Sequence, residues 1–418
     1  MRSALHRQCR CTQDLPARCG TTASPSWKIR VSENNRGRQR VLHVITSLGQ
    51  GGAETVLFRL VQATLDGFDH HVISMHDEGV FAARLRDLGV AVTVLGMRRG
   101  ALSAGGLRRL RRVLVKFRPD LVQTRLDHAN LVGGVMARWN HDTPCIWAVH
   151  STDLGSFRAS WKTRAVRVCC ALLSRRLPRA IVSDSASGAA LHARSGFDAA
   201  KFVVVPNGVD SIAFRPDDLA RARVRATWGL APDELLLGCV ARWDPAKDHE
   251  NLIHALKLLA PQRENWTCVL VGNGMTAENT ELRAILERYG VSGRVRAVGP
   301  TADVPGAMAA IDLHVLASQS ESQPVAVIEA MACATPCVVT DVGDAGAVVG
   351  ETGWIVPPRD PQALCTALKA AIDSTSHTGF AERRQSCRDR AVAEFSLSGM
   401  ASRYALIWSR FARPRAES

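Results

Sequence analysis

Residues 318–344 constrain the fold more than any other stretch, because they predict a loop, a helix and a buried strand in close succession. Pro324 suits the first turn of a helix, where a missing N–H costs nothing, and the apolar residues that follow end before Pro336. The next run, Cys337 to Thr340, is short, apolar and β-branched, as expected of a strand buried on both faces in a parallel sheet. Since ligands bind such sheets at strand C-termini and helix N-termini, this stretch predicts one wall of a ligand cleft.

Two glutamates belong to this predicted wall. Glu321 lies in the loop before the helix, and Glu329 lies inside the helix. Spacing alone is weak evidence, because Glu329 could equally be a solvated helix residue and Glu321 a first-turn acid that the helix dipole favours. Other parts of the chain therefore have to show whether a ligand site surrounds them.

Two cations follow another predicted strand. Within residues 238–248, GCVARWDPAKD, an apolar strand is followed by Arg242 and Lys247, ahead of an amphipathic helix that begins near Asp248. Either residue alone would most often be a solvated surface charge. Placed together after the C-terminus of a strand, they suit a pyrophosphate leaving group.

Glycine turns follow three further predicted strands. Residues 41–60, VLHVITSLGQGGAETVLFRL, predict a strand, a turn containing Gly51 and Gly52, and an amphipathic helix. The GxGxxG spacing of dinucleotide-binding proteins is absent from this turn, which disfavours an oxidoreductase. Residues 201–210, KFVVVPNGVD, predict a strand that stops at an Asn207-Gly208 turn, where two halves of the chain would join. Residues 270–274, LVGNG, supply a further strand and loop with Asn273.

His150 directly follows the predicted buried strand Cys145 to Val149 and precedes a Ser-Thr-Asp sequence. A histidine in this position is more often structural than catalytic when nothing else is known. His128, in TRLDHANLVGG, is a lesser candidate. Both interpretations stay open at this point.

Taken in order, these five motifs resemble the retaining glycosyltransferases of family four, the glycosyl transferases of group 1, over residues 40–412. The signature in question is a Glu, seven residues, and a second Glu that opens an "EAMA" helix. By this resemblance Glu329 would hold the ribose hydroxyls of a donor nucleotide, and Glu321 would face the transferred sugar. Carboxylates suit this task because their oxygens accept hydrogen bonds from vicinal hydroxyls.

The same resemblance implies roles for the other motifs. It assigns His150 to the donor sugar as a catalytic residue together with Glu321. The donor-binding residues that it implies are Gly51, Gly52, Asn207, Arg242, Lys247, Asn273, Val325, Ala326 and Glu329. Val325 and Ala326 enter because Pro324 has no N–H to offer to a phosphate.

The chain also departs from the family pattern. Where many relatives have Glu-Gly-Phe, this sequence has Glu321, Ser322 and Gln323 before Pro324. A serine could crowd an amide approach that a glycine would permit. This departure puts the identity of the donor in doubt and, to a lesser degree, the activity.

The length of 418 residues is too great for one ordinary core, and strands alternate with helices throughout. The predicted fold class is α/β, with two facing Rossmann-like, doubly wound parallel-sheet domains and the cleft between them, the GT-B arrangement by resemblance. We expect a basic, disordered leader over residues 1–38, an acceptor-side domain over 39–209 and a nucleotide-sugar domain over 210–396. Residues 397–418 would add a helix, over 398–411, that packs back on the first domain.

Composition limits the cellular setting. Twelve cysteines are scattered without metal-ligand spacing, and no apolar run is long enough to span a bilayer. We therefore expect a cytoplasmic protein with reduced thiols and no metal site. Cys9, Cys11 and Cys19 fall in the basic leader, without a fourth ligand at convincing spacing.

Positive charge is concentrated in the first half of the sequence, where residues 1–210 hold 31 Lys and Arg against 15 Asp and Glu. One predicted helix there is crowded with arginine over residues 107–118, and a second basic segment contains Trp161 and Lys162. Such helices can lie on anionic lipid on the inner face of a membrane. A solvated helix is an equal alternative, whereas nucleic acid is disfavoured because no recognised binding module accompanies the charge.

The predicted function is therefore transfer of a sugar from a UDP- or GDP-linked donor to a hydroxyl of a growing glycan, with retention, in cell-surface polysaccharide or lipid-linked oligosaccharide assembly. The partners would be the nucleotide-sugar donor, a glycan or lipid-linked acceptor and an anionic membrane surface. No metal or other cofactor is required in this interpretation, since cations of the chain would stabilise the diphosphate. The alternatives are a catalytically silent GT-B subunit that binds glycans or acts as a scaffold, and a nucleotide-sugar epimerase.

Overall fold

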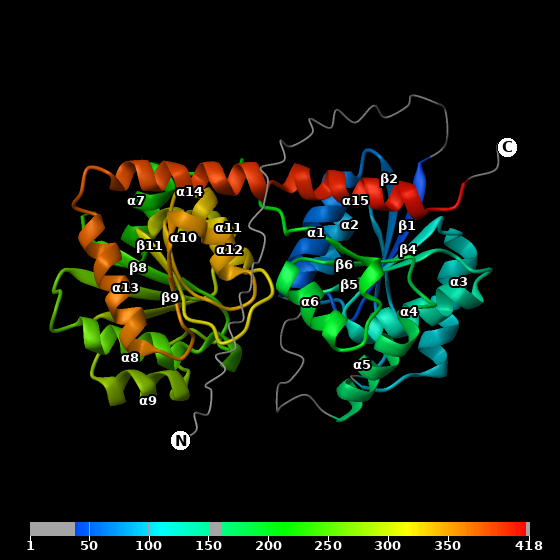
Figure 1. The fold of residues 1–418 in the computed structure, drawn as a ribbon, viewed down its shortest axis with the longest axis horizontal. Helices are drawn as coiled ribbons and strands as arrows, with labels where there is room; N and C mark the ends of the chain where they lie inside the picture. The colour runs from blue at the N-terminus through cyan, green and yellow to red at the C-terminus, as the bar shows by residue number, and fades with distance from the viewer. Residues whose placement is uncertain (1–37, 50, 99, 151–160, 232, 415–418) are drawn as a thin grey trace, which may run out of the picture. The chain divides into compact units, whose positions relative to one another are not determined.

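Two β-sheets with their helices make up the structure, a computed structural model that describes residues 38–49, 51–98, 100–150, 161–231 and 233–414 (Figure 1). We call the first sheet with its helices the first half. Its elements are β1 Gln39–Ile45, α1 Gly52–Thr64, β2 Phe68–Ser74, α2 Phe81–Asp87, β3 Ala91–Val94, α3 Ala104–Phe117, β4 Leu121–Arg125, α4 Asp127–Trp139, β5 Cys145–Val149, α5 Trp161–Leu173, β6 Ala180–Ser183, α6 Ala186–Arg194 and β7 Phe202–Val204.

The second sheet and its helices form the second half. Its elements are α7 Asp218–Thr227, β8 Leu235–Val240, α8 His249–Leu259, β9 Trp266–Val271, α9 Thr280–Tyr289, β10 Val295–Gly299, α10 Val304–Ala310, β11 Leu313–Leu316, α11 Val325–Ala332, β12 Cys337–Thr340, α12 Ala345–Val349, β13 Trp354–Val356, α13 Pro361–Ser374 and α14 Phe380–Glu394. Three short 3-10 turns, at Ala199–Lys201, Pro245–Lys247 and Gly350–Thr352, and the helix α15 Leu397–Phe411 complete the described part of the chain.

Both sheets are parallel and doubly wound. The strand orders are β3-β2-β1-β4-β5-β6-β7 and β10-β9-β8-β11-β12-β13. The order reverses beside the first strand of each sheet, between β1 and β4 and between β8 and β11, and ligands bind at such switch points. The predicted α/β class with two Rossmann-like sheets is confirmed.

Apolar cores cover both faces of each sheet. In the second half, one core packs α8, α9 and α13 against the strands, and the opposite core packs α10, α11, α12 and α14 (Figure 1). In the first half, α3, α4 and α5 cover one face, while α1, α2 and α15 cover the other. Helices on both faces leave the C-terminal edge of each sheet as the open place for a ligand.

The last helix closes the chain onto the first sheet. Trp408 of α15 is fully buried, and its Nε1 donates a hydrogen bond of 3.0 Å to Gln123 of β4. The start of α15 also meets the segment after β7, because the Leu397 amide donates to the Val209 carbonyl oxygen at 2.9 Å. α15 begins at Leu397, one residue before the predicted 398–411 helix.

Several sequence predictions fall outside the described residues. The leader with Cys9, Cys11 and Cys19 lies there except for Arg38, and so do Ser151, Thr152 and Asp153. Within the described ranges, none of the helices is both long and apolar enough to cross a membrane. The nine cysteines found there are free thiols, eight of them buried.

Candidate functional site

A cleft of about 550 Å³ lies between the two sheets, and loops from both halves line it. All the residues predicted for catalysis and donor binding border it: Gly51, Gly52, His150, Asn207, Arg242, Lys247, Asn273, Glu321, Val325, Ala326 and Glu329. They meet because each follows the C-terminal end of a parallel strand or belongs to the helix after it, and these ends share one edge of a sheet.

Lys247 and Glu321 form a tight pair in the second half. Nζ of Lys247 lies 2.6 Å from Oε1 of Glu321, and the Ser318 hydroxyl donates to the same oxygen at 2.6 Å. Both charged side chains are largely buried, with 21% and 11% of their surfaces exposed. An ammonium has three N–H donors, so Lys247 can bind a phosphate oxygen while it keeps Glu321.

Arg242 lies at the rim of the cleft. About half of its side chain (52%) is exposed, and it pairs with Asp244 at 2.9 Å. Its backbone oxygen contacts Nε2 of His249 at 3.0 Å, and burial lowers the pKa of His249 to about 4. A neutral His249 can thus donate to this carbonyl and fix the loop that carries Arg242.

A glycine turn holds the Glu321 loop against the second sheet. Gly343 follows β12 with φ of +59°, and a Cβ there would lie 2.1 Å from the backbone oxygen of Glu321. The backbone amide of Asp344 donates to the backbone carbonyl oxygen of Ser322 at 2.8 Å. Only a residue without a side chain allows this close approach, so Gly343 fixes where Glu321 stands.

Glu329 sits on α11, whose N-terminus faces the cleft without a side-chain cap. α11 starts at Val325, so Pro324 precedes the first helical residue rather than occupying the first turn as predicted. Burial raises the pKa of Glu329, while the charge and the hydrogen bond of Arg59 act in the opposite direction. Arg59 comes from α1 of the first half, and its Nη2 lies 2.5 Å from Oε1 of Glu329.

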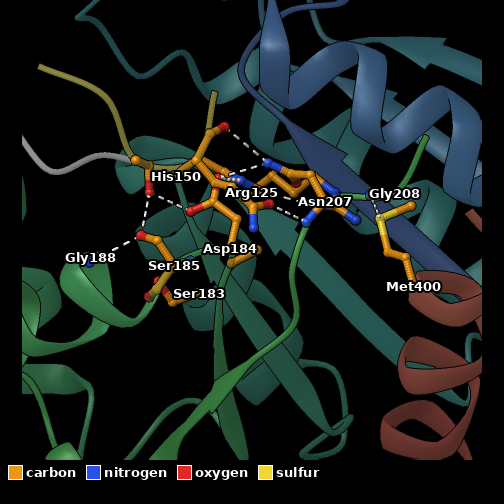
Figure 2. A network of polar contacts seen from close by, with 12 residues as sticks. Arg125, His150, Ser183, Asp184, Ser185, Gly188, Asn207, Gly208 and Met400 are labelled. Atoms are coloured by element: carbon orange, nitrogen blue, oxygen red, sulfur yellow. Dashed lines mark hydrogen bonds and ion pairs between the residues drawn. The ribbon is translucent and has the colours of Figure 1, made fainter. Parts of the chain in front are cut away.

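In the first half, a chain of largely buried polar side chains reaches the lining of the cleft at His150, Asp184 and Asn207 (Figure 2). Nη1 of Arg125 donates to Nε2 of His150 at 3.1 Å, and Nδ1 of His150 lies 3.2 Å from Oδ2 of Asp184. Because a guanidinium only donates, this arrangement selects the His150 tautomer that carries its proton on Nδ1. In this geometry both ring nitrogens are occupied, so a hydrogen bond between the ring and a sugar would need the ring to turn.

Asp184 connects the first half to the Glu321-Ser322-Gln323 segment, the one that departs from the family pattern. Its Oδ1 accepts a short hydrogen bond from the Ser322 hydroxyl, which also lies 2.7 Å from the hydroxyl of Ser185 (Figure 2). Asn207 donates to Asp184 through Nδ2 at 3.3 Å, and its backbone amide donates to the Gln323 side chain. Ser322 thus points into a buried network between the halves, which is a different role from crowding a phosphate.

Sequence reasoning missed four of these residues: Arg59, Arg125, Asp184 and Asp344. Asp344 accepts from the backbone amides of Ala186 and Ser187, at 2.8 and 3.0 Å, and so caps α6 from the other half. The available signal was position, since Arg125 ends β4 and Asp184 directly follows β6, as His150 follows β5. Polar residues at the ends of neighbouring parallel strands share an edge. Arg59, on the inner side of a helix, carried no comparable signal.

A second hollow, of about 440 Å³, opens in the first half and is lined by Thr46, Ser47, His76, Gly100, His128, Lys162 and Thr163. The structure therefore places His128 here and not in the main cleft. Ser47 connects the linings of the hollow and the cleft, because its hydroxyl donates at 3.2 Å to Glu54, which lines the cleft.

Among the described residues there is no group of three His, Cys, Asp or Glu side chains that could hold a metal ion.

Similarity to known proteins agrees with this geometry. Residues 50–211 match the sequence model described as Glycosyltransferase Family 4, and residues 234–374 match Glycosyl transferases group 1. The D-inositol 3-phosphate glycosyltransferase of Jonesia denitrificans is 36% identical over 197 residues, covering 44% of this chain and 46% of that protein. The lipopolysaccharide core biosynthesis mannosyltransferase LpcC of Rhizobium leguminosarum bv. viciae is 31% identical, covering 48% and 56%.

The chain spans about half the length of these curated relatives. Among solved structures, Anabaena HepE in complex with UDP-glucose superimposes with a TM-score of 0.79 at 23% identity, covering 89% of this chain and all of that one. That likeness shows the fold, two Rossmann-like domains of the GT-B type. With one family model on each half and the matching fold around a shared cleft, the chain belongs to glycosyltransferase family 4, the glycosyl transferases of group 1.

Proposed function

We propose that this protein transfers a sugar from a UDP- or GDP-linked donor to a hydroxyl of a growing glycan, with retention at the anomeric carbon. The observation that carries this proposal is the cleft in which Lys247, Arg242 and the α11 N-terminus surround the space beside Glu321 and Glu329. Cations and free N–H groups suit a diphosphate, and carboxylates suit hydroxyls. Retention is inferred from the family.

The proposed reaction exchanges one bond for another at the anomeric carbon. The bond to the diphosphate oxygen breaks, the acceptor oxygen bonds on the same face, and the acceptor proton passes to an oxygen of the departing phosphate. Lys247 and Arg242 would stabilise the charge that builds on this diphosphate. Glu321, held by Ser318 and Gly343, would orient the sugar, and Glu329 would bind the ribose.

His150 would act on the same sugar from the first half. In the structure its ring is held between Arg125 and Asp184, so its orientation is fixed by buried partners. We propose that His150 contacts the donor sugar after a turn of the ring, or through its ring edge in the observed orientation. The chemistry needs no metal in this proposal, because the chain supplies the cations.

The acceptor would reach the cleft from the first half, and a membrane would hold it there. The exposed side of α5 carries Trp161, Val168 and Leu172, which are 75%, 59% and 72% exposed and lie at helical spacing on one face. Lys162 on the same helix also lines the second hollow. An apolar stripe beside basic residues suits the interface of an anionic bilayer, and a lipid-linked acceptor would be presented next to Lys162.

The first experiment is a donor panel. Purified protein is incubated with UDP-, GDP- and ADP-sugars, with and without chelator, and nucleotide diphosphate release and thermal shift are measured. We expect release from one donor that chelator does not change and that Glu329→Ala abolishes, while the exposed Glu287→Ala variant on α9 retains it. A thermal shift without release, even with acceptors added, would favour the silent binding protein, and no response to any donor would overturn the proposal.

Membrane association has its own test. Vesicles of neutral lipid with and without anionic lipid are sedimented with the protein at low salt, where screening is least. We expect binding only to the anionic vesicles, weakened by added salt and by the Leu172→Ser variant. Equal recovery in the supernatant with both vesicles would remove the membrane from the proposal and leave the transfer reaction untouched.

A further inference from the structure

Arg59 belongs to the helix of the first glycine motif, residues 41–60, but it is not among the predicted site residues, and it reaches from the first half to a proposed donor-binding residue of the second. It projects from α1, and its Nη2 lies 2.5 Å from Oε1 of Glu329 on α11. The two side chains are only 13% and 10% exposed. Because water is largely excluded, salt screens this ion pair much less than it screens a surface pair.

The guanidinium is held in place by more than its charge. It lies over the ring of Phe214, 5.3 Å from the centroid, and Phe214 itself is only 4% exposed. Around Arg59 on α1, Val56 and Leu60 are buried in the first half. Both the start of the arginine side chain, beside Val56 and Leu60, and its guanidinium, over Phe214, are therefore packed. This packing fixes the direction from which the guanidinium donates to Glu329.

Arg59 favours the charged form of Glu329. Burial raises the pKa of its carboxyl, and Arg59 is the cation that opposes the effect. Another titratable neighbour is the Cys333 thiol, directly after α11, which interacts electrostatically with Glu329 as well as with Arg388 of α14 and Asp217. In the described part of the chain, no second cation pairs with Glu329.

We propose that Arg59 is a positioning residue of the donor site: it fixes the Glu329 carboxylate so that its second oxygen is free for the vicinal hydroxyls of the donor ribose. The inference rests on the proposed function, in which Glu329 binds that ribose. Each carboxylate oxygen accepts more than one hydrogen bond, so the pair with Arg59 and the bonds from ribose can coexist. The first half thus takes part in nucleotide recognition without touching the nucleotide.

The test compares two nucleotides on Arg59 variants. The nucleoside diphosphate that the donor panel identifies, and its 2′,3′-dideoxy analogue, are titrated calorimetrically against wild type, Arg59→Gln and Arg59→Lys. We expect Arg59→Gln to weaken the normal nucleotide by at least about 10-fold, as for loss of a charge-assisted hydrogen bond, and the dideoxy analogue hardly at all. Arg59→Lys, which restores the charge, should recover part of the preference.

A pH series adds a readout that a merely structural role would not move. Without Arg59, the carboxyl of Glu329 takes up a proton at higher pH than in wild type, and a protonated carboxyl accepts fewer hydrogen bonds. The preference of Arg59→Gln for the normal over the dideoxy nucleotide should therefore fall further as the pH is lowered, at pH values where the wild-type protein keeps its preference. A preference that stays parallel to wild type across the series would count against the inference.

Two control variants separate positioning from general loosening. Arg225→Met breaks a buried ion pair of the second half that does not line the cleft, and Arg86→Gln removes an exposed arginine of α2. Neither should change the preference for normal over dideoxy nucleotide.

The outcomes distinguish the two proposals. If Glu329→Ala keeps the full ribose preference, the proposed role of Glu329 fails, and the inference on Arg59 with it. If Glu329→Ala erases the preference while Arg59→Gln keeps it, only the inference on Arg59 is overturned. Tighter binding by Arg59→Gln would also overturn it, because Arg59 would then be blocking the site.

Discussion

The two halves place their charges around the cleft in different ways. In the second half the cations pair with acids of the same half, Lys247 with Glu321 and Arg242 with Asp244. In the first half, polar groups reach across, as Arg59 does to Glu329 and Asp184 does to Ser322. The second half therefore holds a preformed set of charged groups, the proposed donor-binding residues, and the first half contacts this set from across the cleft.

This difference follows from the sheets. Lys247 and Glu321 follow β8 and β11, which are neighbours in one sheet, so a single domain sets their distance. The pairs that cross the cleft join residues that are far apart in the sequence and belong to different halves. Asp184 and Ser322 are separated by 138 positions, and Arg59 and Glu329 by 270. Changes in the second half should thus act on the chemistry directly, and changes in the first half should act on orientation.

The largest expected effect comes from the preformed set. Lys247→Ala removes the largely buried ammonium from the proposed diphosphate site and from its pair with Glu321. We expect turnover to fall by roughly 10²–10³, the scale of losing one preorganised electrostatic group, with the fold intact. Steady-state kinetics and circular dichroism check this, with the exposed Lys257→Ala variant of α8 as control. Near-normal turnover would mean that Lys247 does not face the leaving group.

Two buried arginines, one in each half, allow a comparison of what a buried cation contributes to stability. Arg225 of α7 is 2% exposed and pairs with Asp312, whereas Arg125 is fully buried, with Nε and Nη2 lacking hydrogen-bond partners in the described structure. We expect Arg225→Met to cost about 3 kcal/mol of unfolding free energy, because the largely buried Asp312 carboxylate loses this cation. Asp312 keeps its ion pair with Arg221, at 2.6 Å, and this remaining pair limits the loss of unfolding free energy. Chemical denaturation measures this.

Arg125→Met should instead leave the unfolding free energy unchanged or raise it, because no carboxylate loses its partner. Its effect should appear in kcat/KM, with a fall of about 10-fold to 100-fold as His150 loses the donor on Nε2. A stable Arg125→Met protein with wild-type kinetics would show that this cation does not act through His150.

Gly343→Ala should break the contact that sets the Glu321 loop. We expect a loss of about 1–3 kcal/mol from the left-handed backbone, with a further loss from the clash with the Glu321 oxygen. Gly290→Ala is the matched control, because Gly290 also has positive φ (+69°) but nothing lies within 4 Å of the position that a Cβ would take there. Thermal unfolding of both variants isolates the contact, and equal shifts would show that the loop simply moves aside.

The smallest expected effect is a pH dependence of stability. Burial lowers the pKa of His314 in β11 to about 4, from an ordinary 6.5. Between these values the unfolded chain binds more protons than the folded one, so stability falls as the pH falls. For one such histidine the loss is about 1 kcal/mol between pH 7 and pH 5.5.

His314→Leu should reduce the pH dependence by the share of this one histidine without a loss of stability at pH 7, because both ring nitrogens of His314 lack partners among the described residues. His70 of β2 has the same lowered pKa but contacts Thr64 and His43 at 3.0 Å. His70→Leu should therefore cost stability at every pH. Urea unfolding at several pH values compares the two, and an unchanged slope in His314→Leu would contradict the assignment.

The sequence by itself determined the fold class and one wall of the cleft. The strand-turn-helix pattern and the glycine, cation and glutamate motifs are local, and parallel strands bring their C-terminal ends to one edge whatever else the chain does. The residues predicted for catalysis and donor binding accordingly line one cleft, whereas the lesser candidate His128 lines the second hollow. The prediction that Pro324 lies within the first turn was off by one residue, because α11 begins only at Val325.

Only the tertiary structure decided how those residues are partnered. Nothing in the local pattern of α1 marks Arg59 as the cation of Glu329, and nothing in the Glu321-Ser322-Gln323 sequence shows that Ser322 bonds to Asp184. These contacts join different sheets, so they depend on how two domains meet and not on periodicity. Burial then raises the pKa of Glu329 while Arg59 opposes that shift, and the hydrogen bond from Arg125 selects the tautomer of His150.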